Sequence, residues 1–170
     1  VNVSQIDGDN TAGFNKMGLV GGLRVITVLT EKSDFSVELL YSQRGSKNDP
    51  SEPYQIQIDL NYIEVPFTYN YKDWYNEEKG YYKIQAIGGF AFSRLLEATL
   101  ADFSGEAEVT NDYSTNDFGI VLGAEFFLSE HWSLSGRWSR SLNKLGGATV
   151  SPTNKDLRGY FISFRLNYTF

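Results

Sequence analysis

The chain has 170 residues, a formal net charge of −6 and no cysteine. The lack of cysteine excludes a disulfide scaffold, a thiolate metal site and cysteine catalysis, and the acidic balance argues against nucleic-acid binding, which needs a basic footprint. No apolar run approaches the ~20 residues that a membrane helix needs. This does not exclude a membrane β-barrel, because the strands of such a barrel alternate in polarity. The sequence has no charged-then-apolar leader, so we expect any signal peptide to be absent from it.

Polar and apolar residues alternate along the chain, which is the pattern of strands with two different faces. In chain order, the alternating segments lie at about 13–30, 35–45, 54–71, 81–97, 117–128, 131–143 and 157–170. Val1–Gln5 supplies an eighth strand, and we expect its N-terminal part to be cut off, since single-chain bacterial barrels have an even number of strands. With no helical periodicity and no linker, residues 1–170 are expected to form one domain.

The last strand carries the clearest pattern. From Tyr160 to Phe170 one face is wholly apolar or aromatic, the other is mostly polar, and the chain stops on a phenylalanine. A strand between lipid and a barrel lumen has this pattern. We therefore predict an all-β fold, an eight-stranded antiparallel up-and-down transmembrane β-barrel. The residues expected to face lipid include Leu122, Phe126, Leu134, Ile162 and Phe164.

Connection lengths predict the orientation, because outer loops are longer than inner turns in such barrels. The expected outer loops are about 6–12, 45–53, 98–116 and 144–156, and the expected inner turns are about 30–34, 72–80 and 129–130. The long turn at 72–80 contains Trp74 and Tyr75, which we interpret as an interfacial aromatic anchor. In the segment 54–71 the alternation changes phase, which predicts a β-bulge near Asn61 and Tyr62.

Two short motifs add a family resemblance. Tyr41–Gly45 reads YSQRG and Tyr62–Pro66 reads YIEVP. Their order and spacing resemble the PorT-type outer membrane protein beta-barrel domain family, whose members are small porin-family barrels of the OmpA-like kind. The resemblance implies a location in the bacterial outer membrane and no defined activity. It also implies that the terminal aromatics Tyr168 and Phe170 are a signal for the barrel-assembly machinery.

Charged residues occupy the faces expected to point inward. They are Arg24, Glu38, Arg44, Glu64, Lys83, Glu125, Arg137 and Arg165. They could form a selectivity ring or proton path, or a network of ion pairs that fills the lumen. We favour the network, because an eight-stranded barrel is just wide enough for side chains to fill and buried charges pair. A narrow porin or channel is the alternative.

The longest expected loop, 98–116, is the main candidate for an interaction site. Long loops on a rigid scaffold are where binding residues usually lie. Its candidate residues are Asp102, Phe103, Glu106, Glu108, Asp112 and Tyr113. Acidic and aromatic side chains together suggest contact with a divalent cation bridge, the lipopolysaccharide headgroup layer or a partner protein. A solvated, mobile loop kept soluble by its charge is an equally good interpretation.

Two further classes stay open. His131 and Ser133 share a strand face with carboxylates nearby, which resembles the active sites of lipid A deacylase barrels, but they follow a tight inner turn, away from the outer leaflet. A soluble lipocalin-like barrel would place apolar residues inside rather than outside. We predict that the protein is not an enzyme, and we expect no cofactor, metal or nucleic-acid partner, since no cluster has metal-ligand spacing.

Overall fold

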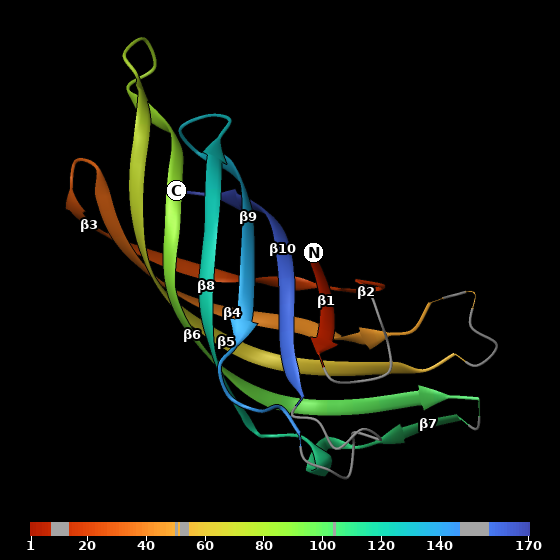
Figure 1. The fold of residues 1–170 in the computed structure, drawn as a ribbon. Helices are drawn as coiled ribbons and strands as arrows, with labels where there is room; N and C mark the ends of the chain where they lie inside the picture. The colour runs from red at the N-terminus through yellow and green to blue at the C-terminus, as the bar shows by residue number, and fades with distance from the viewer. Residues whose placement is uncertain (8–13, 50, 52–54, 104, 147–156) are drawn as a thin grey trace.

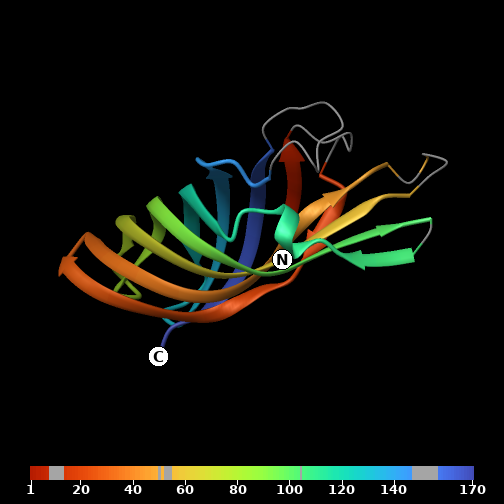
Figure 2. The same cartoon turned by 90° about the horizontal axis from the view of Figure 1, so that it is seen from below.

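The computed structural model of the chain describes residues 1–7, 14–49, 51, 55–103, 105–146 and 157–170. Most of them lie in one antiparallel sheet that curves around on itself (Figures 1 and 2). The strands are β1 (Asn2–Asp7), β2 (Lys16–Gly18), β3 (Val20–Thr30), β4 (Ser33–Lys47), β5 (Gln57–Asn76), β6 (Tyr81–Asp102), β7 (Gly105–Glu108), β8 (Asn116–Phe127), β9 (Trp132–Ser141) and β10 (Arg158–Tyr168). A 3-10 turn, η1 (Thr110–Asp112), follows β7. Among the described residues, no helix is long and apolar enough to cross a membrane.

The strand order shows how the sheet returns to its start. It runs β2-β1-β10-β9-β8-β6-β5-β4-β3. The two ends of this order, β2 and β3, are separated in the chain only by Leu19, whose carbonyl accepts a hydrogen bond from the Gln43 N–H of β4 at 2.8 Å. The stretch 16–30 therefore pairs with β1 at its start and with β4 along the rest. This joins the two ends of the sheet into a barrel.

The all-β antiparallel fold is confirmed, but the sheet has ten strands rather than the expected eight. The interruption at Leu19 divides the expected second strand into β2 and β3, and β7 adds a short strand to the edge of β6. The expected pairing of the first and last strands is confirmed, with Asn2 opposite Ser163 and Asp7 opposite Arg158.

An apolar belt surrounds the outside of the barrel. Leu122 is 54% exposed and Phe164 is 60% exposed, although both would be buried in a protein surrounded by water. Other exposed members of the belt are Leu23, Val25, Phe35, Leu39, Phe67, Tyr69, Phe90, Phe118, Phe126, Leu134 and Leu166. Ile162 is half-buried on the same face. The apolar outside contradicts the lipocalin-like alternative, in which these side chains would point inward.

Connections divide the barrel into two ends. Short turns at 31–32, 77–80 and 128–131 define the turn end, which also holds the C-terminus, and the longer connections define the loop end (Figure 1). The turn expected at 72–80 is shorter, because β5 continues to Asn76 and β6 begins at Tyr81. Trp74 lies within β5 with a φ of 57°. Parts of the expected outer loops 6–12, 45–53 and 144–156 lie outside the described residues.

A bulge lies where the sequence predicted one, but in the neighbouring strand. The pairing of β5 with β6 shifts between Asn61 and Tyr62, which lie opposite Glu97 and Leu95, so the extra residue is Leu96 of β6. Inward-facing residues of β5 run without a phase change from Ile58 to Asn70. The expected phase change in β5 is therefore wrong: its side chains keep their directions, and the interior changes from apolar to polar.

The interior consequently has two regions. Towards the loop end lies the apolar cap, a cluster made of Ile6, Ile58, Leu60, Tyr62, Leu95, Ala98, Tyr113, Leu145 and Leu157. Below it, towards the turn end, lies the charged lumen, where the buried side chains are mostly serine, asparagine, carboxylates and arginine. Along β4 the inward positions pass from Asp34 through Glu38 to Arg44, so the charges are distributed along the axis.

Candidate functional site

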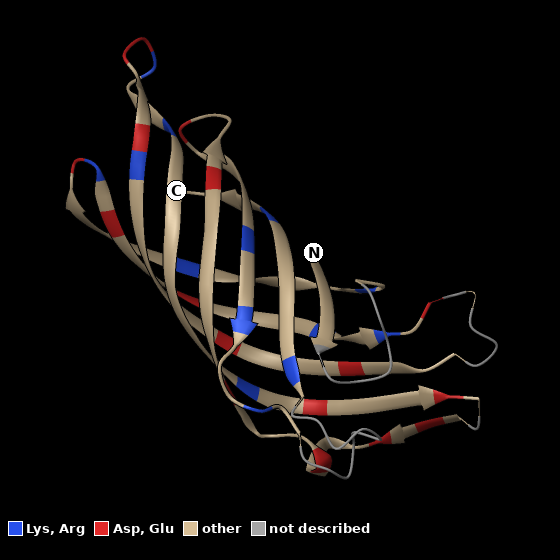
Figure 3. Cartoon of the chain, in the orientation of Figure 1, with Lys and Arg blue, Asp and Glu red and all other residues tan. Residues whose placement is uncertain are grey.

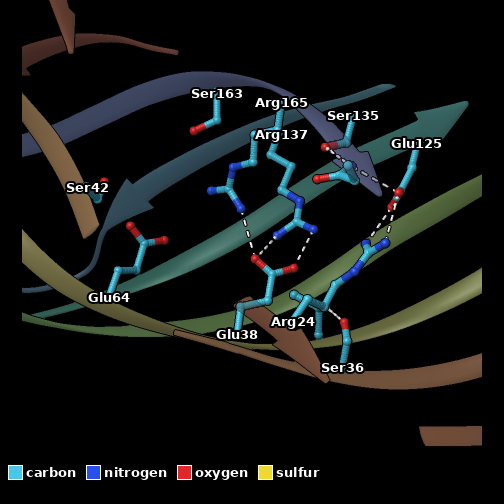
Figure 4. Close-up of polar contacts among 12 residues, drawn as sticks. Arg24, Ser36, Glu38, Ser42, Glu64, Glu125, Ser135, Arg137, Ser163 and Arg165 are labelled. Carbon is cyan, nitrogen blue, oxygen red and sulfur yellow. Dashed lines mark hydrogen bonds and ion pairs between the residues drawn. The ribbon is translucent and has the colours of Figure 1, made fainter. Parts of the chain in front are cut away.

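Glu38 of β4 lies at the centre of the charged lumen (Figure 4). Arg137 of β9 donates to both of its carboxylate oxygens, at 2.9 and 2.6 Å, and Arg165 of β10 donates to Oε2 at 2.9 Å. Glu38 and Arg137 are 3% and 1% exposed. A bidentate pair between a planar guanidinium and a carboxylate is the strongest ion-pair geometry available to a buried charge. It links strands on opposite sides of the barrel.

A second cluster forms around Glu125 of β8, nearer the turn end. Arg24 of β3 donates to both carboxylate oxygens at 2.7 and 3.1 Å. Gln85 and Asn167 donate to the same carboxylate at 2.7 and 3.0 Å, and the Ser133 hydroxyl also donates to it. The carboxylate of Glu125 is therefore fully hydrogen-bonded, which offsets the cost of its burial.

The third cluster forms around Arg44, where the charged lumen meets the apolar cap. Its guanidinium pairs with Glu64 of β5 and with Asp117 of β8, the latter at 3.1 Å. The same group lies 4.8 Å from the ring centre of Tyr62 and 4.1 Å from that of Phe161. Arg44 is thus held by carboxylates on one side and by aromatic rings on the other.

Opposite charges balance across these three clusters. Four arginines face four carboxylates, namely Arg24, Arg44, Arg137 and Arg165 with Glu38, Glu64, Asp117 and Glu125. A balanced interior lacks the single sign of charge that a selectivity ring uses to concentrate one kind of ion.

Free space is unevenly distributed along the axis. A cavity of about 380 Å³ opens at the turn end and is lined by residues that include Arg24, Lys72 and Gln85. The two cavities that touch Arg44 measure about 10 Å³ each. That is close to the minimum for a single water molecule. Of the cavities described, the two beside Arg44 are the smallest.

Seven of the eight charges predicted to line the lumen lie in these clusters, and Lys83 does not. Lys83 is near the turn at 77–80, and its ammonium lies 5.0 Å from the ring centre of Trp74, so it covers the aromatic anchor instead. Sequence reasoning missed Asp117 as a partner of Arg44, and it also missed the pair of Asp34 with Lys72, at 2.9 Å. Asp117 has the same strand phase as Glu125, and this shared phase was the signal available in the sequence; the structure places Asp117 opposite Ser93 of β6.

The candidate loop 98–116 contains regular secondary structure. Its first part extends β6 and folds back as β7, with Thr99 opposite Glu108 and Asp102 opposite Gly105. We call residues 99–108 the loop-end hairpin; it bears three acidic side chains, Asp102, Glu106 and Glu108, and acidic segments are visible on both of its strands (Figure 3). Phe103 is at its tip and is 83% exposed. Tyr113, by contrast, is 6% exposed in the apolar cap, so its side chain supports the fold rather than an outward contact.

The catalytic pair considered from the sequence is not assembled. The Ser133 side chain is buried in the charged lumen, where its hydroxyl donates to Glu125. His131 lies exposed in the turn between β8 and β9, and its Nδ1 is 2.9 Å from the carbonyl oxygen of Thr169. The two side chains therefore belong to different environments, which removes the geometric basis for a histidine that activates this serine.

The terminal aromatics gather on the outside at the turn end. The ring of Tyr168 lies 4.9 Å from that of Trp132 and 5.1 Å from that of Phe170. Phe170 is fully exposed. These rings form an accessible aromatic cluster beside the belt.

Comparison with known families agrees with this architecture. The sequence pattern of the outer membrane protein beta-barrel domain matches residues 1–146. The chain belongs to this family. No curated protein matches the chain. Family membership identifies a small outer-membrane barrel, in which the belt faces lipid and the charged lumen lies at membrane depth; the narrower PorT-type affiliation stays a prediction.

Proposed function

We propose that this protein is a sealed outer-membrane barrel with a structural and interaction role, and that it does not act as a porin. The observation that carries the proposal is the balanced set of ion pairs across the charged lumen, together with cavities of only about 10 Å³ beside Arg44. Hydrated ions need a continuous water path. The barrel wall is small, because β2 and β3 form one interrupted strand and β7 lies off the main strand order, so little space is left once long side chains pair.

Planar-bilayer recording tests the seal. Folded wild-type protein should give no stable conductance steps, whereas Arg44→Ser should give measurable leak, because it removes the side chain between the two small cavities. Ser139→Ala, which shortens a buried lumen side chain without touching the ion pairs, is the matched control. Large, stable and ion-selective steps from the wild type would establish the narrow porin instead.

The interaction role is proposed for the loop-end hairpin. Phe103 is exposed at its tip, and Asp102, Glu106 and Glu108 flank it without a basic residue in the hairpin. An aromatic ring among carboxylates suits a surface that carries divalent cations, such as the lipopolysaccharide headgroup layer, or a basic patch of a partner protein.

A set of substitutions that spares Tyr113 tests this role without damaging the apolar cap. Phe103→Ser with Glu106→Gln and Glu108→Gln should weaken Mg²⁺-dependent binding of lipopolysaccharide to the folded barrel. Glu77→Gln with Glu78→Gln removes the same amount of charge at the turn end and is the control. Equal binding by both variants and the wild type would exclude the hairpin as the contact.

At the turn end, we propose that Tyr168 and Phe170 are recognised by the barrel-assembly machinery. Their exposure beside Trp132 supports this, since an assembly factor must reach the signal before the barrel is complete. Removal of Phe170 should slow assembly in cells while leaving the refolded barrel's thermal stability unchanged; unchanged assembly would contradict the proposal.

A further inference from the structure

We propose that the open cavity at the turn end, here called the turn-end vestibule, binds a small organic cation, namely an ammonium group joined to an apolar body. The vestibule has a volume of about 380 Å³. This is within the range of pockets that hold small molecules, and the mouth of a β-barrel is one of the places where such pockets occur. It lies at the opposite end of the barrel from the loop-end hairpin.

The walls of the vestibule are apolar, unlike the lumen behind it. In β3, Ile26 and Val28 follow Arg24 at alternate positions, so all three share the inward phase and line the cavity. In β8, Phe127 shares the phase of Glu125. Ile26 and Val28 are 36% and 68% exposed although they point into the barrel mouth. Apolar surface that meets water in a concave site favours a ligand that covers it.

Aromatic rings stand at the entrance. Tyr81, Tyr82 and Phe127 all line the vestibule. The Tyr81 hydroxyl donates to the backbone carbonyl of Leu128 at 3.2 Å, which fixes the ring between β6 and the turn at 128–131. The faces of aromatic rings attract ammonium groups because of the ring quadrupole. The rings therefore suit a cationic ligand as well as an apolar one.

The charges around the vestibule decide between a cation and an anion. Arg24 is paired with Glu125 at 2.7 Å, and Lys72 is paired with Asp34 at 2.9 Å. Glu130 lines the same cavity, is exposed, and has no ion-pair partner among the described residues. One negative charge is thus left uncompensated, and it attracts a cation to the entrance. An anion would have to compete with the carboxylates that already hold Arg24 and Lys72.

The inner end of the vestibule is closed by the charged lumen. Arg24, Gln85 and Glu125 form a hydrogen-bonded cluster directly behind it. Beyond this cluster, the cavities beside Arg44 measure only about 10 Å³ each. A ligand that enters is therefore held rather than passed through the barrel. Binding itself does not depend on the seal, so titration tests it separately from conductance.

A titration with two probes of opposite charge tests the site. Hexyltrimethylammonium is added to the folded wild-type barrel in nanodiscs of zwitterionic lipid, and the heat measured with empty nanodiscs is subtracted. Hexanesulfonate, which has the same alkyl chain and a negative head, is the control probe. The cation should bind saturably at one site and at least roughly tenfold more tightly than the sulfonate. Equal binding of the two probes, or no saturable binding of the cation, would overturn the proposal.

Two variants with matched controls locate the binding. Glu130→Gln should weaken binding of the cation by roughly two- to fivefold, because the carboxylate is exposed. Glu78→Gln removes the same charge from the neighbouring turn and should leave the affinity unchanged. Val28→Lys places a cation inside the vestibule and should abolish binding, whereas Thr27→Lys, on the outer face of the same strand, should not. Heat-modifiable gel mobility confirms that each variant is folded. Equal affinities for Glu130→Gln and Glu78→Gln would place the cation elsewhere and overturn the proposal.

Discussion

The charged lumen and the apolar cap are built by the same strands, yet they have opposite polarity. β5 passes through both: Ile58 and Leu60 point inward in the cap, and Glu64 and Thr68 point inward in the lumen. The outward residues change in the opposite sense, from Gln57 and its polar neighbours beside the cap to Phe67 and Tyr69 beside the lumen. What surrounds the barrel therefore determines what fills it.

Physical chemistry explains the inversion. At membrane depth, hydrocarbon surrounds the wall, so apolar side chains face outward and the polar ones must pair inside. Beyond the membrane, water surrounds the wall and the usual hydrophobic burial applies. The guanidinium of Arg44 lies at the boundary, with carboxylates on its lumen side and the rings of Tyr62 and Phe161 against it. The following substitutions test this comparison.

Glu38→Gln should have the largest effect. It removes the carboxylate that pairs with both Arg137 and Arg165, and an uncompensated buried charge typically costs ~3–5 kcal/mol. Denaturant unfolding in detergent micelles measures the loss. Glu97→Gln, on the water-facing side of β6, is the control and should stay within ~0.5 kcal/mol of wild type. Similar losses for both variants would contradict the distinction between the inner and outer faces.

Leu60→Ala probes the apolar cap. Leu60 is 1% exposed, and truncation of a buried leucine costs ~2–5 kcal/mol in unfolding free energy because a cavity is left. The same change at Leu122 in the belt should cost less, since lipid or detergent fills the space. If the two losses are equal in the same unfolding assay, the cap does not behave as a protein core.

Arginine substitutions on the outer face test which part of the wall faces lipid and which part faces water. Leu122→Arg should cost ~2–4 kcal/mol, because Leu122 faces the hydrocarbon region. Gln57→Arg lies on the outer face beside the apolar cap and should change stability by less than ~0.5 kcal/mol. Unfolding in lipid vesicles gives both values, and a large cost at Gln57 would mean that the membrane extends to the cap.

Tyr62→Phe should have the smallest effect. The Tyr62 hydroxyl is buried and makes no hydrogen bond within the described residues, so its removal deletes no pair. Replacement should leave stability unchanged or raise it by up to ~1 kcal/mol. A loss well above that value in the same assay would reveal a polar partner for this hydroxyl.

The strand positions and the belt followed from the sequence because period-two alternation reports two different environments. Alternation does not report which environment is inside. This is why the sequence predicted a phase change and a bulge near Asn61 and Tyr62, although Ile58 and Leu60 point inward like the later polar residues and belong to the cap. The change of polarity along β5 was visible, but the sequence alone could not distinguish a bulge from a change of surroundings.

The candidate site was predictable in composition but not in pairing. Inward charges such as Glu38 and Arg137 followed from strand phase, while their partners depend on which strands face each other across the barrel. Lys83 has the phase of a lumen residue, yet it lies near the turn end of β6, where its ammonium contacts the ring of Trp74. Tyr113 was expected to be exposed, because the return of the loop onto the cap depends on tertiary contacts.

The pairing of β1 with β10 has a consequence for biogenesis. The backbone contact of Val1 with Phe164 spans 163 positions of the chain. Contacts between residues so distant in sequence form slowly, because the loop must close before any contact stabilises it. Until β10 arrives, the edges of β1 and β9 are open to strands of other molecules. The earlier part of the chain therefore needs protection from aggregation until its last segment has been exported.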